Sequence, residues 1–166
     1  MDRAGPEILE QMYAFADKKG RPICLIPEVT ALVQDLYRSR WSKFLPKPVR
    51  IFYISRCYRY ERPQQGRYRE FWQLGVEVLG GSAPDDALEV RAMLEKLLNI
   101  AGITYQLVDG VKRGLDYYVE DGFEAESPVL GAQKQVAGGG RYDCGIGFAL
   151  GLDRILLARR LEQRRA

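Results

Sequence analysis

Four arginines lie close together in one short stretch of this sequence, among aromatic residues and a glycine. The stretch reads YRYERPQQGRYREFWQLGVEVLG and contains Arg59, Arg62, Arg67 and Arg69. A guanidinium group stays charged and presents a planar set of donors that can bind two phosphate oxygens at once. The residue type and the spacing therefore favour a polyanion, and we expect a nucleoside triphosphate to bind here.

The second half of this stretch carries polar residues at alternate positions. Gln73, Gly75 and Glu77 share one face if the stretch is a strand, and Arg59 and Glu61 are expected to share a face of the preceding strand. Polar side chains on a buried face destabilise the fold unless a polar group meets them, so we expect an amino acid to bind beside the triphosphate. The alternative is a surface hairpin whose arginines and glutamates pair with one another.

Two glycine-rich segments contain an arginine nearer the end of the chain. VAGGGRYD contains Arg141, and GIGFALGLDR contains Arg154. Glycines in a strand mark a bulge or the close approach of another group such as a nucleotide, although tight packing of backbone on backbone stays open. Neither segment fits a P-loop or a Rossmann fingerprint. Arg113, in KRGLDYY, is by itself no more than a charge at the edge of a strand.

The composition describes an ordinary globular protein and limits its chemistry. The chain has 166 residues, 46% hydrophobic and 28% charged, with a formal net charge of +3, so we expect one domain without an overall basic field. The lack of histidine excludes Ser–His and Cys–His catalysis and imidazole metal ligands, and we assign no metal ligand to any side chain. Three widely spaced cysteines and no long apolar segment predict a cytoplasmic protein without membrane contact.

Apolar periodicity predicts an α+β fold of several antiparallel strands with helices on one side. Two long strands, at 47–60 and 69–80, are expected to pair across the loop RPQQG. Shorter strands are expected within PICLI, ITYQLV, GLDYYVEDGFEA and AQKQVA. Helices are expected at 6–17, 27–38, 85–99 and 151–160.

Five segments, taken in order, resemble those of one protein family. PEVTA resembles the histidine-site loop of the histidyl-tRNA synthetases, and the stretch from Tyr58 to Gly80 resembles motif 2 of the class II aminoacyl-tRNA synthetases in its histidyl version. RGLDYY resembles the first histidine-specific signature, AGGGRYD a following strand segment, and GFALGLDR motif 3. The resemblance covers the chain from about Met12 to Leu157. It implies a class II synthetase-like, mainly antiparallel sheet flanked by helices.

The resemblance implies a role for each matching arginine. Arg59 matches the motif 2 arginine at the α-phosphate of ATP, and Arg113 matches the family's distinctive arginine near the same phosphate. These two are the expected catalytic residues. Arg67 and Arg154 match arginines at the outer phosphates, and Glu61 matches a carboxylate close to the nucleotide. The implied cofactors are ATP, as a substrate, and Mg²⁺.

Other matching positions imply a histidine site. Glu28, Thr30 and Gln73 match residues around the ammonium and carboxylate groups of the amino acid, and Glu77 and Tyr118 match residues that bind the imidazole. The implied reaction is attack of the histidine carboxylate on the α-phosphorus of ATP, which releases pyrophosphate and forms histidyl-adenylate. Such a step depends on positioning and cationic stabilisation and requires no general base.

The sequence also departs from the family pattern. Motif 1, which builds the family's dimer interface, has no counterpart before Met12, VDGVK stands in place of an insertion domain, and no anticodon-binding domain follows motif 3. Cys144 leads directly into GIGFALG, and Ile26 stands where the family has an arginine. We therefore expect residues 1–166 to form a single truncated catalytic domain. Whether it charges tRNA(His), and whether it forms a homodimer, stays open.

Two other functions stay open beside the synthetase. One is a non-catalytic regulatory paralogue, similar to the synthetase-like subunit that controls ATP phosphoribosyltransferase. The other is an inert core scaffold that is too loose to catalyse the reaction. The sequence favours the synthetase because a pure regulator needs no complete set of phosphate-binding groups, and the chain carries Arg59, Gln73, Glu77, Arg113 and Arg154.

Overall fold

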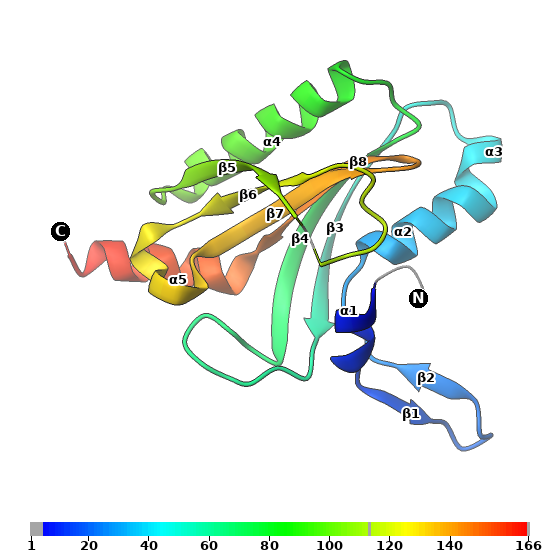
Figure 1. The fold of residues 1–166 in the computed structure, drawn as a ribbon, viewed down its shortest axis with the longest axis horizontal. Coiled ribbons are helices and arrows are strands. Elements are labelled where there is room, and N and C mark those ends of the chain that lie inside the picture. Colours follow the sequence, from blue (N-terminus) through cyan, green and yellow to red (C-terminus); the bar gives the residue numbers. More distant parts are fainter. Residues whose placement is uncertain (1–4, 113, 166) are drawn as a thin grey trace.

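The structure is a computed structural model and describes residues 5–112 and 114–165. Its centre is a six-stranded antiparallel sheet with the strand order β3-β4-β8-β7-β6-β5 (Figure 1). The strands are β3 (Val49–Tyr58), β4 (Glu70–Leu79), β5 (Gln106–Val111), β6 (Gly122–Glu126), β7 (Gln135–Tyr142) and β8 (Gly145–Gly151). The predicted α+β class, with a mainly antiparallel sheet flanked by helices, is confirmed.

The predicted long hairpin is β3 paired with β4. The register runs from Val49 opposite Leu79 to Tyr58 opposite Glu70, and residues 59–69 form the loop between the strands (Figure 1). β4 also pairs with β8, which places Glu77 opposite Gly147. Because directly opposed residues share a face, the polar residues of β4 lie beside the glycines of β8.

Helices α4 (Asp85–Ala101) and α5 (Leu152–Gln163) cover one face of this sheet. They pack apolar side chains against Val78, Phe148 and Leu150 of β4 and β8. α4 ends at Gly102, whose φ of 65° gives the left-handed conformation that often terminates a helix. Both helices extend two or three residues beyond the predicted ends. The buried apolar residues of the helices are Val90, Leu94, Leu98, Ile155 and Ala158.

Helix α2 (Thr30–Leu36) lies on the opposite face, so the expectation of helices on one side only was wrong. It continues through a π-helical turn (Tyr37–Trp41) into the short α3 (Ser42–Phe44). Ala31, Val33 and Tyr37 form an apolar cluster with Val49, Leu79 and Tyr142. Leu79 shares a face of β4 with Glu77, since the two are two residues apart. The helix expected at 27–38 begins only at Thr30.

The N-terminal segment differs from the predicted helix at 6–17. Helix α1 spans only Pro6–Glu10, and β1 (Ala14–Ala16) then pairs with β2 (Pro22–Cys24) in a separate two-stranded sheet. The turn between them depends on the Asp17 carboxylate, which accepts hydrogen bonds from the backbone N–H groups of Lys19 at 2.8 Å and Arg21 at 2.9 Å. Local turn chemistry therefore overrides the helical spacing of the apolar residues.

Short connections complete the domain. Asp143 and Cys144 alone join β7 to β8, because Tyr142 already pairs with Gly145. VDGVK lies largely within β5, where the register shifts between Asp109 and Val111. A 3-10 helix at Pro128–Gln133 connects β6 to β7. Across residues 5–112 and 114–165, we find no helix that has the length and apolar character needed to cross a membrane.

Candidate active site

A cavity lies where the loop of residues 59–69 folds over β4, β7 and β8. The loop supplies Arg59, Glu61 and Arg67 to its lining, α5 supplies Arg154, and β4 supplies Gln73. The structure thus brings all the described residues predicted to bind ATP into one cavity, together with one residue of the predicted histidine site. The floor between them consists of small residues, among them Gly138, Ala149 and Gly151.

Arg59 and Glu61 do not lie on a strand as predicted, because β3 ends at Tyr58. The hairpin pairing continues for one more residue, since the Arg59 N–H donates to the Arg69 carbonyl at 3.0 Å. Beyond that point the chain turns, and the Glu61 N–H donates to the Arg59 carbonyl at 2.8 Å. The loop, rather than strand alternation, therefore directs these two side chains to the same cavity.

The Arg59 guanidinium is held from two sides. Its Nε donates to the Pro27 carbonyl at 2.9 Å, and its central carbon lies 5.3 Å from the centroid of the Phe71 ring. A cation over an aromatic face is stabilised by the ring quadrupole. These contacts use Nε and one face of the group, so its terminal nitrogens are oriented by neighbours from two separate segments.

Arg154 is fixed entirely by uncharged acceptors. Nε donates to the Gly66 carbonyl at 2.5 Å, and the terminal nitrogens donate to the Gln135 carbonyl at 2.8 Å and to Oε1 of Gln133 at 3.2 Å. None of these partners neutralises its charge. Arg154 also joins α5 to the 59–69 loop, because its contact with Gly66 lies within that loop.

The cavity carries an excess of positive charge. Burial lowers the pKa of Arg154, and the positive charges of Arg59 and Arg67 lower it further, while Glu61 acts in the opposite direction. Glu61 itself forms an ion pair with Arg67 at 2.5 Å. The lining thus carries three guanidinium groups and the two carboxylates of Glu61 and Asp153, and this imbalance suits a polyanionic ligand.

A buried polar cluster lies farther along the same sheet face. Glu77 is fully buried, and its Oε1 accepts a hydrogen bond from the Thr30 hydroxyl at 2.8 Å. Its Oε2 accepts one from the Tyr142 hydroxyl at 2.7 Å. The Tyr53 hydroxyl lies 3.2 Å from Thr30 Oγ1 and 3.5 Å from Glu77 Oε1. A methyl group on Gly147 would overlap Glu77 Oε2, so glycine is required there.

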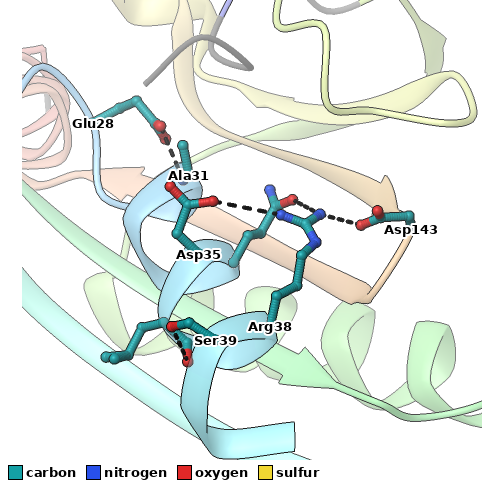
Figure 2. Close-up of polar contacts among 8 residues, drawn as sticks. Glu28, Ala31, Asp35, Arg38, Ser39 and Asp143 are labelled. Atoms are coloured by element: carbon teal, nitrogen blue, oxygen red, sulfur yellow. Dashed lines mark hydrogen bonds and ion pairs between the residues drawn. The ribbon is translucent and has the colours of Figure 1, made fainter.

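Glu28 lies at the edge of the same cluster, at the start of α2 (Figure 2). Its carboxylate accepts hydrogen bonds from the Ala31 N–H at 2.9 Å and from the Tyr117 hydroxyl at 3.4 Å. In the π-helical turn that follows α2, Arg38 forms an ion pair with Asp143 in the turn between β7 and β8 (Figure 2). These contacts fix α2, and with it Glu28, against the sheet.

Burial alters the proton affinity of both carboxylates. It raises the pKa of Glu77 to about 7, although the Tyr142 and Thr30 hydroxyl donors act to lower it. It also raises the pKa of Glu28, against the opposing effects of the Ala31 N–H and the Arg59 charge. Two buried acids with raised pKa values mark a position where cationic or N–H donor groups of a ligand would be favoured.

Gln73 connects the two parts of the site. It lines the cavity, and its Oε1 accepts a hydrogen bond from the buried Cys57 thiol at 3.2 Å. Burial raises the pKa of that thiol to about 11, so the sulfur keeps its proton and can donate. Thr30, Glu77 and the rest of the buried cluster lie beyond Gln73 and do not line this cavity.

Tyr118 and Arg113 complete the predicted set. The Tyr118 ring packs on Tyr117 with a centroid separation of 4.7 Å, and Tyr118 forms an isolated bridge with Tyr142. It therefore adjoins the cluster that holds Glu77. Arg113 lies outside the described residues.

Sequence reasoning missed Tyr117, whose hydroxyl donates to Oε2 of Glu28 at 3.4 Å, and three further residues of the site. Tyr53 and Tyr142 contact the Glu77 cluster, and Cys57 contacts Gln73. Strand alternation contained the signal for Tyr53 and Cys57, because the register places them opposite Gly75 and Phe71 of the polar face. Tyr142 required the pairing of β7 with β8, which the sequence does not specify.

This sheet and its motifs define a class of protein. The fold is that of the class II aminoacyl-tRNA synthetases, as in the apo S. aureus histidyl-tRNA synthetase, which superposes with a TM-score of 0.78 at 24% identity. That likeness covers 92% of this chain and 61% of the S. aureus chain. A profile of the histidyl-tRNA synthetases matches residues 2–111. The chain belongs to the histidyl-tRNA synthetase family.

Two further comparisons describe its relatives. A histidine–tRNA ligase of Archaeoglobus fulgidus is 29% identical over 265 residues, covering 96% of this chain and 64% of the relative. That matched stretch is longer than the 166-residue chain, so the relative has residues within it that lack a counterpart here. An ATP phosphoribosyltransferase regulatory subunit/histidyl-tRNA synthetase from Bacillus halodurans has a TM-score of 0.75 at 18% identity, covering 90% of this chain and 68% of its own.

Proposed function

We propose that this chain binds ATP and histidine and forms histidyl-adenylate. The observation that carries the proposal is the convergence of Arg59, Arg67 and Arg154 on one cavity beside Gln73. These residues come from two distant segments and are held by several neutral contacts. A surface hairpin with compensating ion pairs, the alternative considered for the sequence alone, would not need Arg154 of α5 in the same cavity.

The arginines have distinct roles in the proposed reaction. Arg59 lies between the cavity and Glu28, so it would bind the α-phosphate where the two substrates meet. Arg67 and Arg154 would bind the outer phosphates, and Glu61 would orient Arg67 through their ion pair. Arg113 would approach the α-phosphate from a second side, as the family resemblance implies. Fixed cations that face a developing phosphoryl charge stabilise the transition state without reorganisation.

The buried cluster would bind the amino acid. Glu28, Thr30 and Gln73 would hold its ammonium and carboxylate groups, and Glu77 and Tyr118 would bind the imidazole. A carboxylate oxygen of histidine then attacks the α-phosphorus, the new O–P bond forms, and the bond to the β-phosphate oxygen breaks. The leaving electron pair stays on pyrophosphate. No proton moves in this step, which agrees with a site built from arginines.

Magnesium would enter with the nucleotide. Mg²⁺ takes oxygen ligands and is usually bound by phosphates, water and one or two carboxylates. The cavity lining includes Glu61 and Asp153, which supply such oxygens. Asp153 already accepts a hydrogen bond from the Trp72 N–H at 2.6 Å. The residues present therefore fit a metal held mainly by ATP, and the chemistry that it would supply is to offset phosphate charge.

Histidine-dependent exchange of pyrophosphate into ATP tests this proposal. We expect exchange with histidine and none with the other nineteen amino acids. Arg154→Ala should reduce exchange at least 10-fold, whereas Arg160→Ala, a change in the same helix outside the cavity lining, should not. Histidine binding without any exchange would refute the enzymatic proposal.

That last result would favour the second candidate, a regulatory paralogue. The likeness to the Bacillus halodurans protein supports this candidate at the level of the fold. The synthetase and the regulatory paralogue require different residues. A regulator that binds histidine needs the buried cluster but not three phosphate-binding arginines. The third interpretation, an inert scaffold, predicts binding of neither ligand.

The remaining roles follow from the family and are likewise proposals. We propose that residues 1–166 form a single catalytic domain in which no insertion domain separates Leu107 from Arg113, that the chain acts in the cytoplasm, and that it associates as a homodimer. Transfer of the histidyl group to tRNA(His) would use the acceptor end, since the 59–69 loop borders the cavity. Aminoacylation measured beside exchange separates this transfer from activation.

A further inference from the structure

Hydroxyl groups from three different elements surround the Glu77 carboxylate. Thr30 from α2 and Tyr142 from β7 each donate to one of its oxygens, at 2.8 Å and 2.7 Å. Tyr53 from β3 lies next to Thr30, and its hydroxyl oxygen is 3.2 Å from Thr30 Oγ1. Tyr53 and Tyr142 are not among the residues that the family resemblance assigns to the site.

The protons of these hydroxyls determine the direction of the network. Each hydroxyl has one proton, and the proton of Thr30 lies toward Glu77. Thr30 can therefore only accept from Tyr53, whose hydroxyl also lies 3.5 Å from Glu77 Oε1 and donates toward that oxygen as well. All three hydroxyl groups direct their protons toward the carboxylate, and Glu77 acts only as an acceptor. A ligand atom that approaches Glu77 must then be a donor.

The backbone around this network is shaped to contain it. Methyl groups on Gly75 and Gly147 would overlap Tyr53 and Glu77, respectively. Apolar packing alone would not require an acid at a fully buried position, where a charge is unfavourable unless it is hydrogen-bonded. The titratable groups that face Glu77 include Tyr53, Tyr142, Glu28 and Tyr117. Tyr53 and Tyr142 support its ionised form through hydrogen bonds, whereas the negative charge of Glu28 opposes it.

We propose that Tyr142 and Tyr53 are positioning residues that keep the Glu77 carboxylate ionised and aimed as an acceptor for an N–H group of the bound amino acid. This inference rests on the proposed function for the identity of the ligand. It adds a reason for selectivity, because a side chain that lacks an N–H donor would leave the buried carboxylate without its last partner.

The test compares Tyr142→Phe and Tyr53→Phe with Tyr105→Phe. The first two changes remove a hydroxyl of the network and keep the ring. Tyr105, whose hydroxyl donates to Oδ1 of Asn99 at 3.2 Å, is the matched control. Carbon-13 NMR of the glutamate carboxyls gives the pKa of Glu77 without ligand. Calorimetry at pH 7.5 gives the dissociation constants of histidine and of ATP.

We expect Tyr142→Phe to raise the Glu77 pKa and to weaken histidine binding roughly 10-fold, with ATP binding changed less than about 2-fold. Tyr53→Phe should act in the same direction and more weakly, because the Tyr53 hydroxyl lies 3.5 Å from the carboxylate and the Tyr142 hydroxyl lies 2.7 Å from it. Tyr105→Phe should leave all three quantities unchanged. An unaltered Glu77 pKa in both network variants, or equal losses for histidine and ATP, would overturn the proposal.

The two arms also separate this inference from the proposed function. A wild-type protein that binds no histidine would refute the proposed function, while the NMR measurement would still decide whether the tyrosines control Glu77. If Tyr142→Phe does not fold, Tyr53→Phe provides the same comparison from another strand.

Discussion

Arg59 joins the two halves of the site at the level of single side chains. Its guanidinium lines the cavity, contacts the Pro27 carbonyl immediately before Glu28, and acts on the Glu28 carboxylate through its charge. The α-phosphorus and the amino acid carboxylate must meet between these halves if the proposed reaction occurs. A single fixed cation at that junction can orient both reactants, which is the largest contribution expected of such a site.

Arg113 provides a sharp test of the residue assignments, because its role rests on the family resemblance. We expect Arg113→Ala to reduce histidine-dependent pyrophosphate exchange at least 100-fold, since a cation at the α-phosphate acts mainly in the transition state. The neighbouring Lys112→Ala is the control for loss of a positive charge in the same segment. Unchanged exchange in Arg113→Ala, with the variant folded by circular dichroism, would remove this residue from the mechanism.

The raised pKa of Glu77 gives a prediction that needs no substrate. A carboxyl with a folded-state pKa of about 7 and an ordinary value of 4.5 binds more protons in the folded state between these pH values. Unfolding free energy should therefore fall as pH rises from 5 to 8, by at most about 3 kcal/mol from this group. Glu77→Gln should flatten that slope, although Glu28, whose pKa is also raised, would retain its own share.

Urea denaturation at several pH values measures the slope. Glu89→Gln is the matched control, because Arg50 lowers the pKa of Glu89 and this group is already ionised throughout the range. A slope that stays the same in Glu77→Gln would mean that the buried carboxyl does not titrate between pH 5 and 8.

The sequence predicted which residues meet at the site where those residues belong to short, continuous motifs. The convergence of Arg59, Glu61, Arg67 and Arg154 followed from ordered segments, although two of them proved to lie in a loop rather than on a strand. The contact of Tyr142 with Glu77 joins positions 65 residues apart. No local spacing encodes it, because it depends on the strand order in the sheet.

At the level of elements, the sequence predicted the long segments best. The β3–β4 hairpin and α4 each have a strong apolar pattern, and both formed close to the expected bounds. The predicted helix at 6–17 failed because Asp17 and Gly20 form a turn that favours a hairpin. The position of α2 could not be predicted either, since its apolar residues fit either face of a sheet.

One buried ion pair joins two elements behind the site. Arg141 of β7 donates two hydrogen bonds to Asp86 of α4, at 2.6 Å and 3.1 Å, and the Asp86 side chain is only 3% exposed. Arg141 also precedes Tyr142, so the pair anchors the strand segment that contacts Glu77. Removal of one partner would leave a buried charge unpaired, which is far less favourable than the loss of an exposed pair.

We therefore expect Arg141→Ala to lower the unfolding free energy by about 3 kcal/mol at pH 7. The effect should shrink at acidic pH, because Arg141 lowers the Asp86 pKa and protonation removes the unpaired charge. Arg50→Ala, which breaks the exposed pair with Glu89, should change stability far less than Arg141→Ala. Similar losses for both variants in urea denaturation would show that burial does not distinguish the pairs.

In the molecule as a whole, the six-stranded sheet ends in β3 at one edge and in β5 at the other, and the β3 edge carries exposed apolar side chains. The backbone groups of β3 alternate between β4 and the outer edge. The Arg59 N–H donates toward β4, whereas the Tyr58 N–H donates outward to the Ile26 carbonyl. Phe52 and Ile54 lie an even number of residues from Tyr58, so their backbone groups also point outward. Their side chains are also 74% and 56% exposed. An apolar edge strand of this kind is prone to pair with another chain.

Self-association should therefore depend on the outer edge of β3, and the proposed homodimer would use the same surface. We expect Phe52→Lys and Ile54→Lys to reduce concentration-dependent association in sedimentation velocity, because a charge on an edge strand opposes strand pairing. Leu88→Lys and Ile100→Lys change equally exposed apolar residues of α4 and serve as controls. All four variants should keep wild-type exchange activity, since none lines the arginine cavity. Association that falls equally in the α4 variants would assign the contact to general surface hydrophobicity rather than to this edge.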